Sequence, residues 1–549
     1  MEPIFLYDTT LRDGTQGESI NFSAQEKINI AKRLDELGIH YIEGGWPGSN
    51  PRDMQFFELA RKTAFSQARI TAFGATRRPG ITPAQDENLQ ALIASGTQAV
   101  TLVGKSWDLH VAIMNNTLEE NLKMISESIR YLKDQDREVI YDAEHFFDGY
   151  KENPDYAMQT LAAAIESGAN FLVLCDTNGG TLHYDIETIV QRVHAALADH
   201  QTPHKPGAGV RLGIHAHNDC ASAVANTISA IRAGAVMVQG TINGYGERCG
   251  NADMTSIIPI LCCKMNRPCV SLDQLATLKK VSRYVSETAN MTPLNSRPFV
   301  GRSAFAHKGG IHVSAIVKQP KAYEHMEPGI VGNSRRVLVS DMSGKTNVEY
   351  KARELGVSLE GNGVDSREIV NEIKRLEQEG FQFDVADGSL KILLQKLTGQ
   401  FKPLFTLENY RISMEKDRDE HAWAHAITKV SVEGQKEMTT AEGDGPVNAL
   451  DNALRKVMKK FYPHLGLDAL RLVDYKVRVI DGRDATAAKV RVIIDSRDHE
   501  DIWTTTGVST DIIEASWQAL SDSFQYKLSK DLLAVENSSA VESPSLVNS

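Results

Sequence analysis

Short apolar runs alternate with longer amphipathic segments through the first half of the chain, and this alternation limits the possible folds more than any other feature. Eight such units lie between residue 4 and about residue 264. Apolar residues recurring every three or four positions predict helices, and the short runs between them predict buried strands. The runs begin at eight positions, which are Ile4, Tyr41, Ile70, Ala99, Val139, Phe171, Val210 and Met237.

Eight strand-and-helix units in about 260 residues predict an α/β fold of the (β/α)₈ TIM-barrel type, which carries its active site at the C-terminal ends of the strands. A doubly wound open sheet is the alternative, and it would need a glycine-rich turn after the first strand. Residues 8–14 (DTTLRDG) follow that strand instead. We therefore predict a catalytic barrel over residues 1–268.

The remaining sequence changes character twice. Helical segments separated by irregular sequence predict linker subdomains over residues 269–400. Residues 401–530 alternate β-rich segments with two long helical segments, which predicts an α+β domain of two similar halves. Residues 531–549 are rich in Ser, Asn and Val without periodicity, which predicts a disordered tail.

Composition excludes several classes of protein. A length of 549 residues allows two or three domains, and a net charge of -11 argues against nucleic acid as the main partner. No stretch reaches the roughly 18 apolar residues of a membrane helix, so we expect no membrane partner. The six cysteines are scattered without CxxC spacing, which favours reduced thiols and a cytoplasmic location.

The polar residues after the first and seventh predicted strands have the composition of a metal site. Alternate residues of a strand share a face, so His215 and His217 can bind one ion, with Asp13 as an oxygen ligand from another strand end. This set leaves positions open for water or substrate and suits Zn, Mn, Mg, Co or Fe, with little to choose between them. Asn251 could add a fourth ligand directly or through water.

A cation beside the predicted metal site indicates carbonyl chemistry. Arg12 precedes Asp13, and a guanidinium next to a Lewis acid fits activation of a 2-oxo acid. A structural Arg–Asp pair is the alternative. Glu144 and Thr177 follow the fifth and sixth strands and would position substrate or water, and Tyr141 could contribute to substrate selection.

Four motifs, in this order, resemble a known family. They are residues 8–14 (DTTLRDG), 215–219 (HAHND), 243–251 (NGYGERCGN) and 305–312 (FAHKGGIH). The chain resembles the group of metal-dependent acyltransferases that contains 2-isopropylmalate, homocitrate and citramalate synthases, whose barrel is related to hydroxymethylglutaryl-CoA lyase. Residues 443–449 (GDGPVNA) are similar to the C-terminal regulatory domain of this family.

The resemblance implies roles for the matching residues. It places Asn251 with the three metal ligands, Arg12 on the 2-oxo acid, and Glu144 and Thr177 near the acceptor or the acetyl group. It also implies that a histidine after the barrel acts on the methyl group of acetyl-CoA.

The family pattern assigns that proton transfer to His312, with Tyr323 assisting. His307 is the alternative histidine. The resemblance also implies a homodimer and an amino-acid effector, isoleucine, at the C-terminal domain. An oligomerisation domain without a ligand is the alternative.

Three segments bear on the acceptor. Residues 43–51 and 141–150 look most like the citramalate synthase branch, and residues 340–345 (SDMSGK) depart from the Gly-Lys-His-Ser-Gly pattern usual in isopropylmalate synthases. The resemblance therefore implies condensation of acetyl-CoA with pyruvate in isoleucine biosynthesis. The alternatives are a 2-isopropylmalate or homocitrate synthase, a barrel lyase, which the long C-terminal domain disfavours, and a non-catalytic amino-acid sensor, which the intact site disfavours.

Overall fold

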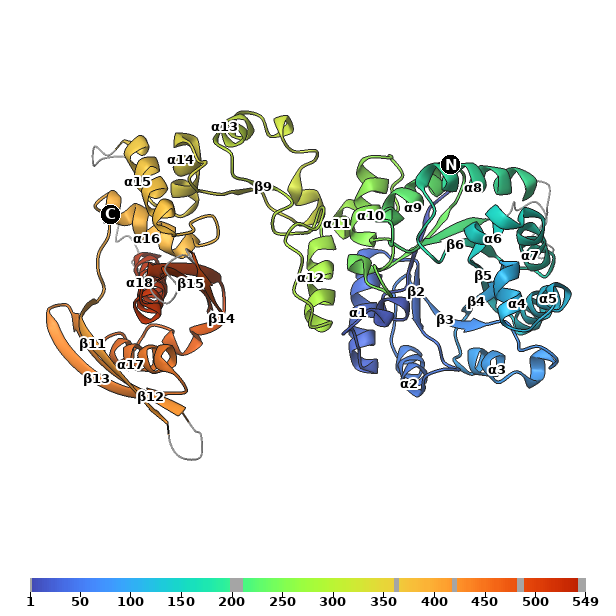
Figure 1. Ribbon diagram of the computed structural model, residues 1–549, viewed down its shortest axis with the longest axis horizontal. Helices are drawn as coiled ribbons and strands as arrows, with labels where there is room; N and C mark the ends of the chain where they lie inside the picture. The colour runs from blue at the N-terminus through green and yellow to red at the C-terminus, as the bar shows by residue number, and fades with distance from the viewer. Residues whose placement is uncertain (1, 198–210, 360–364, 417–421, 481–487, 542–549) are drawn as a thin grey trace, which may run out of the picture. The chain divides into compact units, whose positions relative to one another are not determined.

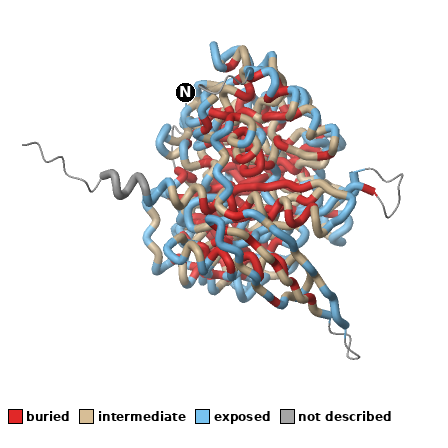
Figure 2. The backbone as a smooth tube through the Cα atoms, turned by 90° about the vertical axis from the view of Figure 1, so that its left-hand side faces the viewer, coloured by how far each residue is buried: buried red, intermediate tan, exposed pale blue. Residues whose placement is uncertain are grey.

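The computed structural model describes residues 2–197, 211–359, 365–416, 422–480 and 488–541 (Figure 1). Two compact units divide the chain. The first comprises Met1–Phe305 with Met326–Ser334, and the second comprises Ala306–His325 with Arg335–Ser549. Figure 2 shows the buried residues gathered inside and the exposed residues outside.

A closed barrel of eight parallel strands, in sequence order, forms the centre of the first unit. The strands are β1 (Phe5–Asp8), β2 (Tyr41–Gly45), β3 (Arg69–Ala75), β4 (Ala99–Lys105), β5 (Glu138–Glu144), β6 (Phe171–Asp176), β7 (Leu212–Ala216) and β8 (Met237–Gly240). The predicted (β/α)₈ fold is confirmed. Of the eight predicted strand starts, only Val210 lies outside the described residues.

Helices surround the barrel (Figure 1). They are α1 (Ala24–Leu37), α2 (Pro51–Ala60), α3 (Glu87–Ala94), α4 (Asp108–Ile113), α5 (Leu118–Asp134), α6 (Phe146–Glu152), α7 (Pro154–Glu166), α8 (His183–Leu197), α9 (Ala223–Arg232), α10 (Met254–Cys263), α11 (Leu272–Leu275) and α12 (Leu278–Thr288). Local sequence fixes several of their starts. Ser23 and Glu26 form a capping box at α1, and Asn50 caps α2 ahead of Pro51 at its first position.

Strand alternation sorts the barrel side chains into two layers. Tyr7, Ile140 and Val173 belong to the cluster that fills the barrel interior, whereas Leu6 and Tyr141 belong to the larger core between the strands and the helices. Side chains two positions apart therefore share a layer, and side chains an odd number of positions apart do not. This parity decides which strand-end residues can reach the mouth of the barrel.

The second unit contains a helical part and two similar α+β halves. Its helices are α13 (Gly310–Lys318), α14 (Lys345–Glu354), α15 (Ser366–Glu379), α16 (Asp387–Leu397), α17 (Pro446–Phe461) and α18 (Ile512–Val541). Its strands are β9 (Ala306–His307), β10 (Arg336–Val337), β11 (Thr406–Lys416), β12 (Ala422–Val432), β13 (Gln435–Gly443), β14 (Arg471–Val479), β15 (Val490–Arg497) and β16 (Ile502–Ser509). The strands β11 to β13 and β14 to β16 form two antiparallel sheets, and each sheet is followed by a long helix, as the sequence predicted.

Helix α18 differs from the sequence prediction of a disordered tail over residues 531–549. It continues to Val541. Lys527 is buried in the helix and pairs with Asp531 one turn later at 2.6 Å, which supports helical structure beyond residue 530. Residues 542–549 of the predicted tail lie outside the described residues, and the domain boundaries at 268, 400 and 530 stay predictions. Within the described ranges, no helix has the length and apolar character needed to cross a bilayer.

Asp8 ends β1 as a fully buried carboxyl group outside the barrel interior. Its oxygens accept hydrogen bonds from the backbone N–H of Thr10 at 2.9 Å and from the Thr10 hydroxyl at 3.0 Å. Thr10 Oγ1 in turn accepts from the backbone N–H of Ile242 at 2.8 Å, so Asp8 links the loop after β1 to the loop after β8. Burial raises the pKa of Asp8 from 3.8 to about 7.

We expect Asp8→Asn to change how stability depends on pH. The folded protein holds the Asp8 proton more tightly than the unfolded chain does, so the wild type loses stability as the pH rises from about 4 to about 7. This difference between the pKa of Asp8 in the folded and the unfolded chain corresponds to roughly 4 kcal/mol of unfolding free energy. The stability of the asparagine variant relative to the wild type should therefore increase with pH, as measured by denaturant unfolding midpoints of the full chain.

Asp35→Asn is the matched comparison with the opposite sign. Asp35 accepts three backbone N–H groups, from Ser66, Gln67 and Ala68, at 2.6 to 3.0 Å. Burial alone would raise the pKa of Asp35, but these hydrogen bonds lower it. Its substitution should cost stability at neutral pH and cost less on acidification. Parallel pH profiles for the two variants would contradict the assignment.

Candidate active site

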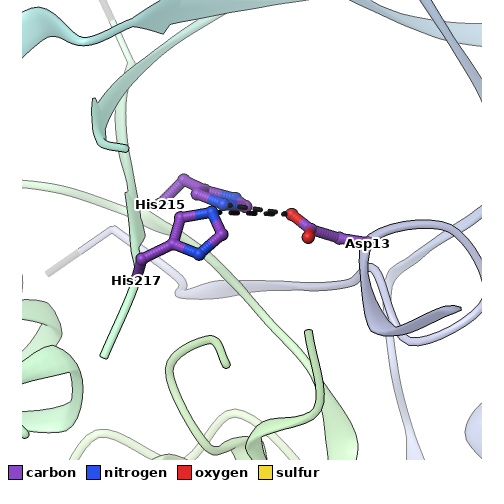
Figure 3. Close-up of side chains that lie close together, drawn as sticks. All are labelled: Asp13, His215 and His217. Carbon is purple, nitrogen blue, oxygen red and sulfur yellow. Dashed lines mark ion pairs between the residues drawn. The ribbon is translucent and has the colours of Figure 1, made fainter. Parts of the chain in front are cut away.

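A carboxylate and two imidazoles converge at the C-terminal end of the barrel. Asp13 begins a 3₁₀ turn (Asp13–Gln16) after β1, and His215 and His217 lie at the end of β7. Oδ2 of Asp13 lies 3.3 Å from Nε2 of His215 and 4.0 Å from Nε2 of His217 (Figure 3). All three residues are buried, and their ligand atoms lie within 4.8 Å of one another.

Unused polar atoms around this triad fit a bound cation. Asp13 Oδ1, His217 Nδ1 and Asn251 Oδ1 are buried and have no hydrogen-bond partner among the described residues. Buried polar atoms without partners are rare and require an explanation such as an ion. The set of one carboxylate, two imidazoles and one amide oxygen matches the donors that hold a divalent metal ion.

The loop after β8 delivers Asn251 to the triad. Asn251 forms an isolated β-bridge with His217, and its Nδ2 donates to the backbone oxygen of Tyr245 at 3.1 Å. Because Nδ2 makes that hydrogen bond, Oδ1 of Asn251 is the amide atom left without a partner among the described residues. A Cβ atom at Gly246 would collide with the Asn251 amide nitrogen, so the close approach of this loop requires glycine at position 246.

The protonation states of Asp13 and His217 suit metal binding. Burial lowers the pKa of His217 to about 4, and the neighbouring His215 contributes a smaller effect in the same direction. This imidazole is therefore neutral at physiological pH. Burial alone would raise the pKa of Asp13, but the Arg12 guanidinium beside it holds that pKa well below its usual range. A neutral imidazole and an ionised carboxylate are the forms that coordinate metal ions.

Arg12 is fixed mainly by Glu43 on β2. Its Nε donates to Glu43 Oε1 at 2.5 Å, whereas its Nη1 lies 3.5 Å from Asp13 Oδ2. The guanidinium stacks on the Phe73 ring at 3.8 Å. Glu43 is fully buried and also accepts hydrogen bonds from the hydroxyls of Tyr7 and Thr9. These contacts hold the guanidinium plane in place beside the triad.

A cavity of about 450 Å³ opens above the triad at the barrel mouth. Six predicted site residues line it together, which are Arg12, Asp13, Glu144, Thr177, His215 and His217. Apolar side chains, including Trp46, Phe73 and Val103, form another part of the wall. The arrangement therefore combines a cation site, a fixed guanidinium and apolar space for a small substrate.

Tyr141 does not belong to this cavity. We predict Tyr141 from the sequence as a substrate contact, but it lies three positions from Glu144 on β5 and therefore faces the opposite side of the strand. Its fully buried ring packs in the core between the barrel and the helices, against Gly104. The prediction for Tyr141 is wrong because strand parity excludes it.

His312 and Tyr323 come together in the second unit. Their rings stack with centroids 4.2 Å apart, and both residues are exposed. The alternative histidine, His307, has its Nε2 3.2 Å from Oε1 of the buried Glu324. Glu324 also binds Arg335 through both carboxylate oxygens at 2.6 Å, so His307 is part of a buried ionic group while His312 is accessible.

Two contacts of the site residues are not predicted by the sequence motifs. Lys105, at the end of β4, forms an ion pair with Glu144 in the cavity wall. Gln239 on β8 is fully buried and lies 2.9 Å from Nδ1 of His215. A glutamine inside a short apolar strand is the signal that could have found it.

Comparisons with known proteins agree with this architecture. The HMGL-like family matches residues 3–281, a homocitrate synthase post-HMGL domain-like family matches residues 299–380, and the LeuA allosteric (dimerisation) domain matches residues 384–528. The (R)-citramalate synthases of Geobacter sulfurreducens and Aquifex aeolicus are 50% and 48% identical, each over 96% of this chain and 98% of theirs. The 2-isopropylmalate synthase of Lysinibacillus sphaericus is 29% identical over 97% of this chain and 99% of its own.

These matches and the barrel site define an acyltransferase of the HMGL-like barrel class. The chain belongs to the HMGL-like family, in the group that joins this barrel to a LeuA-type dimerisation domain and contains the curated (R)-citramalate synthases. The family resemblance seen in the sequence motifs is confirmed.

Asp13→Ala should remove most of the affinity for divalent cations. It deletes the carboxylate that faces both histidines, so we expect a loss larger than the roughly 10–100-fold that residues supporting a ligand contribute. Calorimetric titration of the metal-free full chain with Zn²⁺ or Mn²⁺ measures it. Asp219→Asn is the control, because Asp219 follows His217 by two residues but binds Arg248. Equal losses for both variants would refute the site.

Proposed function

We propose that this protein condenses acetyl-CoA with pyruvate and hydrolyses the thioester, releasing (R)-citramalate and CoA. The observation that carries the proposal is the buried Asp13–His215–His217 triad beside a fixed Arg12 in the barrel cavity. Five curated relatives at 43–50% identity are named (R)-citramalate synthases, which supports the same activity.

The cavity residues would bind and polarise the 2-oxo acid. Asp13, His215, His217 and Asn251 would hold a divalent ion, which supplies Lewis-acid polarisation of a carbonyl group. Arg12 would bind the oxygen on which negative charge develops, and its contact with Glu43 orients it beforehand. This donor set suits Zn, Mn, Mg, Co or Fe.

Two further cavity residues suit substrate positioning. Thr177 Oγ1 accepts the backbone N–H of His145 at 2.9 Å, so its own hydroxyl proton remains to donate to a substrate oxygen. Glu144 is paired with Lys105, which offsets its charge in a cavity that must accept an anionic 2-oxo acid. These contacts support the roles that the family resemblance implies for Glu144 and Thr177.

The carbon–carbon bond requires removal of a proton from the acetyl-CoA methyl group. We assign this step to His312 with Tyr323 assisting, because His312 is accessible whereas His307 is held by Glu324. The resulting enolate attacks C2 of pyruvate, the carbonyl oxygen takes up a proton, and water cleaves the thioester to release CoA.

A comparison of acceptors tests the proposed reaction directly. Release of CoA thiol from acetyl-CoA is measured with pyruvate, 2-oxoisovalerate and 2-oxoglutarate as acceptors. We expect pyruvate to give the highest kcat/KM by at least about tenfold, since each methylene that a pocket must exclude is worth 10-fold or more. A preference for 2-oxoisovalerate would instead assign the chain to 2-isopropylmalate synthesis.

Arg12→Lys should impair the reaction without releasing the metal. Lysine keeps the charge but loses the planar donors and the contact with Glu43, so we expect kcat/KM for pyruvate to fall roughly 100-fold or more. Metal affinity should stay near that of the wild type. Arg283→Lys, on the exposed face of α12, is the control and should leave both quantities unchanged.

We further propose that the C-terminal domain binds isoleucine, that the enzyme serves isoleucine biosynthesis as a homodimer, and that it works in the cytoplasm. The match of residues 384–528 to the LeuA allosteric (dimerisation) domain supports the dimer and a regulatory role.

All six cysteines are free thiols, which is consistent with a reducing compartment. Added isoleucine should inhibit the full chain, and valine at the same concentration is the comparison; inhibition by neither would remove the effector from the proposal.

A further inference from the structure

A chain of three polar side chains crosses the barrel interior and ends at the metal triad. Asp142 on β5, Gln239 on β8 and His215 on β7 all point inward, and each is at most 5% exposed. Gln239 Nε2 donates to Asp142 Oδ1 at 2.9 Å, and Gln239 Oε1 lies 2.9 Å from His215 Nδ1. Gln239 and His215 are direct partners in the strand register.

The amide of Gln239 determines which atoms donate and which accept in this series of hydrogen bonds. A glutamine side chain has donors at one terminal atom and an acceptor at the other. Because its nitrogen faces the Asp142 carboxyl oxygen, its oxygen faces His215 and can only accept. A neutral His215 that donates to this oxygen carries its proton on Nδ1, which leaves Nε2, 3.3 Å from Oδ2 of Asp13, to bind a cation.

A packing role alone does not account for this arrangement. The surrounding interior cluster is apolar and aromatic and includes Tyr7, Ile140, Val173 and Met237. Burying an amide among such residues costs free energy unless its polar ends are bonded. The partner histidine of the pair is different, since Nδ1 of His217 has no hydrogen-bond partner in the part of the chain that the structure describes.

We propose that Gln239 and Asp142 are positioning residues that hold His215 in its Nδ1–H tautomer, ready to bind a divalent cation through Nε2. Gln239 acts on His215 directly, and Asp142 acts by fixing which way the amide points. The proposal rests on the metal centre of the proposed function, and it is independent of which 2-oxo acid the enzyme uses.

The experiment uses full-length, metal-free protein with two readouts other than activity. The ¹⁵N chemical shifts of ¹⁵N-histidine-labelled protein report the tautomer of His215, and calorimetric titration reports Zn²⁺ affinity. Gln239→Met keeps the size of the side chain but removes the acceptor. We expect it to give a mixture of tautomers and a roughly 10–100-fold weaker Zn²⁺ affinity.

Two further variants separate the proposed role from a structural one. Gln239→Glu keeps an acceptor facing His215, so it should retain the Nδ1–H tautomer and recover most of the Zn²⁺ affinity. Asp142→Asn allows the Gln239 amide to point either way, so it should give a smaller loss than Gln239→Met. An Asp142→Asn protein with the tautomer and affinity of the wild type would overturn the part assigned to Asp142.

Asn226→Leu is the matched control. Asn226 is another fully buried amide of the same barrel that donates to a carboxylate, Asp176, at 3.3 Å, and to the backbone oxygen of Thr181 at 2.7 Å. Its loss should lower the thermal midpoint without changing the His215 tautomer or the Zn²⁺ affinity. A Gln239→Met protein that keeps both the tautomer and the affinity of the wild type would overturn the proposal. If the wild type made no citramalate while the tautomer series behaved as expected, the proposed function would fail and this inference would stand.

Discussion

The ionised carboxylate of Asp13, buried in the 3₁₀ turn after β1, is the group on which the rest of the site depends. Removing a charge from water costs several kcal/mol unless partners compensate it. Arg12 supplies part of that compensation, and the unused Oδ1 leaves room for a cation to supply more. The barrel makes this possible because it brings the ends of β1 and β7, two hundred residues apart in sequence, to one edge.

Charge compensation then extends outward from Asp13 through the cavity wall. Arg12 is shared between Asp13 and Glu43, and Glu43 takes further hydrogen bonds from two hydroxyl groups. Lys105 forms an ion pair with Glu144 on the neighbouring strand. The charges that face the cavity are therefore arranged in fixed pairs before any substrate arrives, which is the condition for strong electrostatic effects in a closed site.

The sequence predicted the parts of this molecule that depend on local periodicity. Strand positions followed from apolar runs, and the i, i+2 spacing of His215 and His217 sufficed to place both on one face. The same rule excludes Tyr141 from the cavity, because it lies an odd number of residues from Glu144 and faces the core between the strands and the helices. Gln239 and the role of Glu43 depend on contacts between distant strands, which a single sequence does not encode locally. His312 came only from family resemblance.

The approach of Asn251 to His217 has a consequence for how this protein can vary. The amide of Asn251 occupies the space that a side chain at position 246 would need. An alanine there would displace the Asn251 amide, so the loop after β8 is constrained by the volume of a single methyl group. Position 246 is therefore restricted to glycine although it does not line the cavity itself.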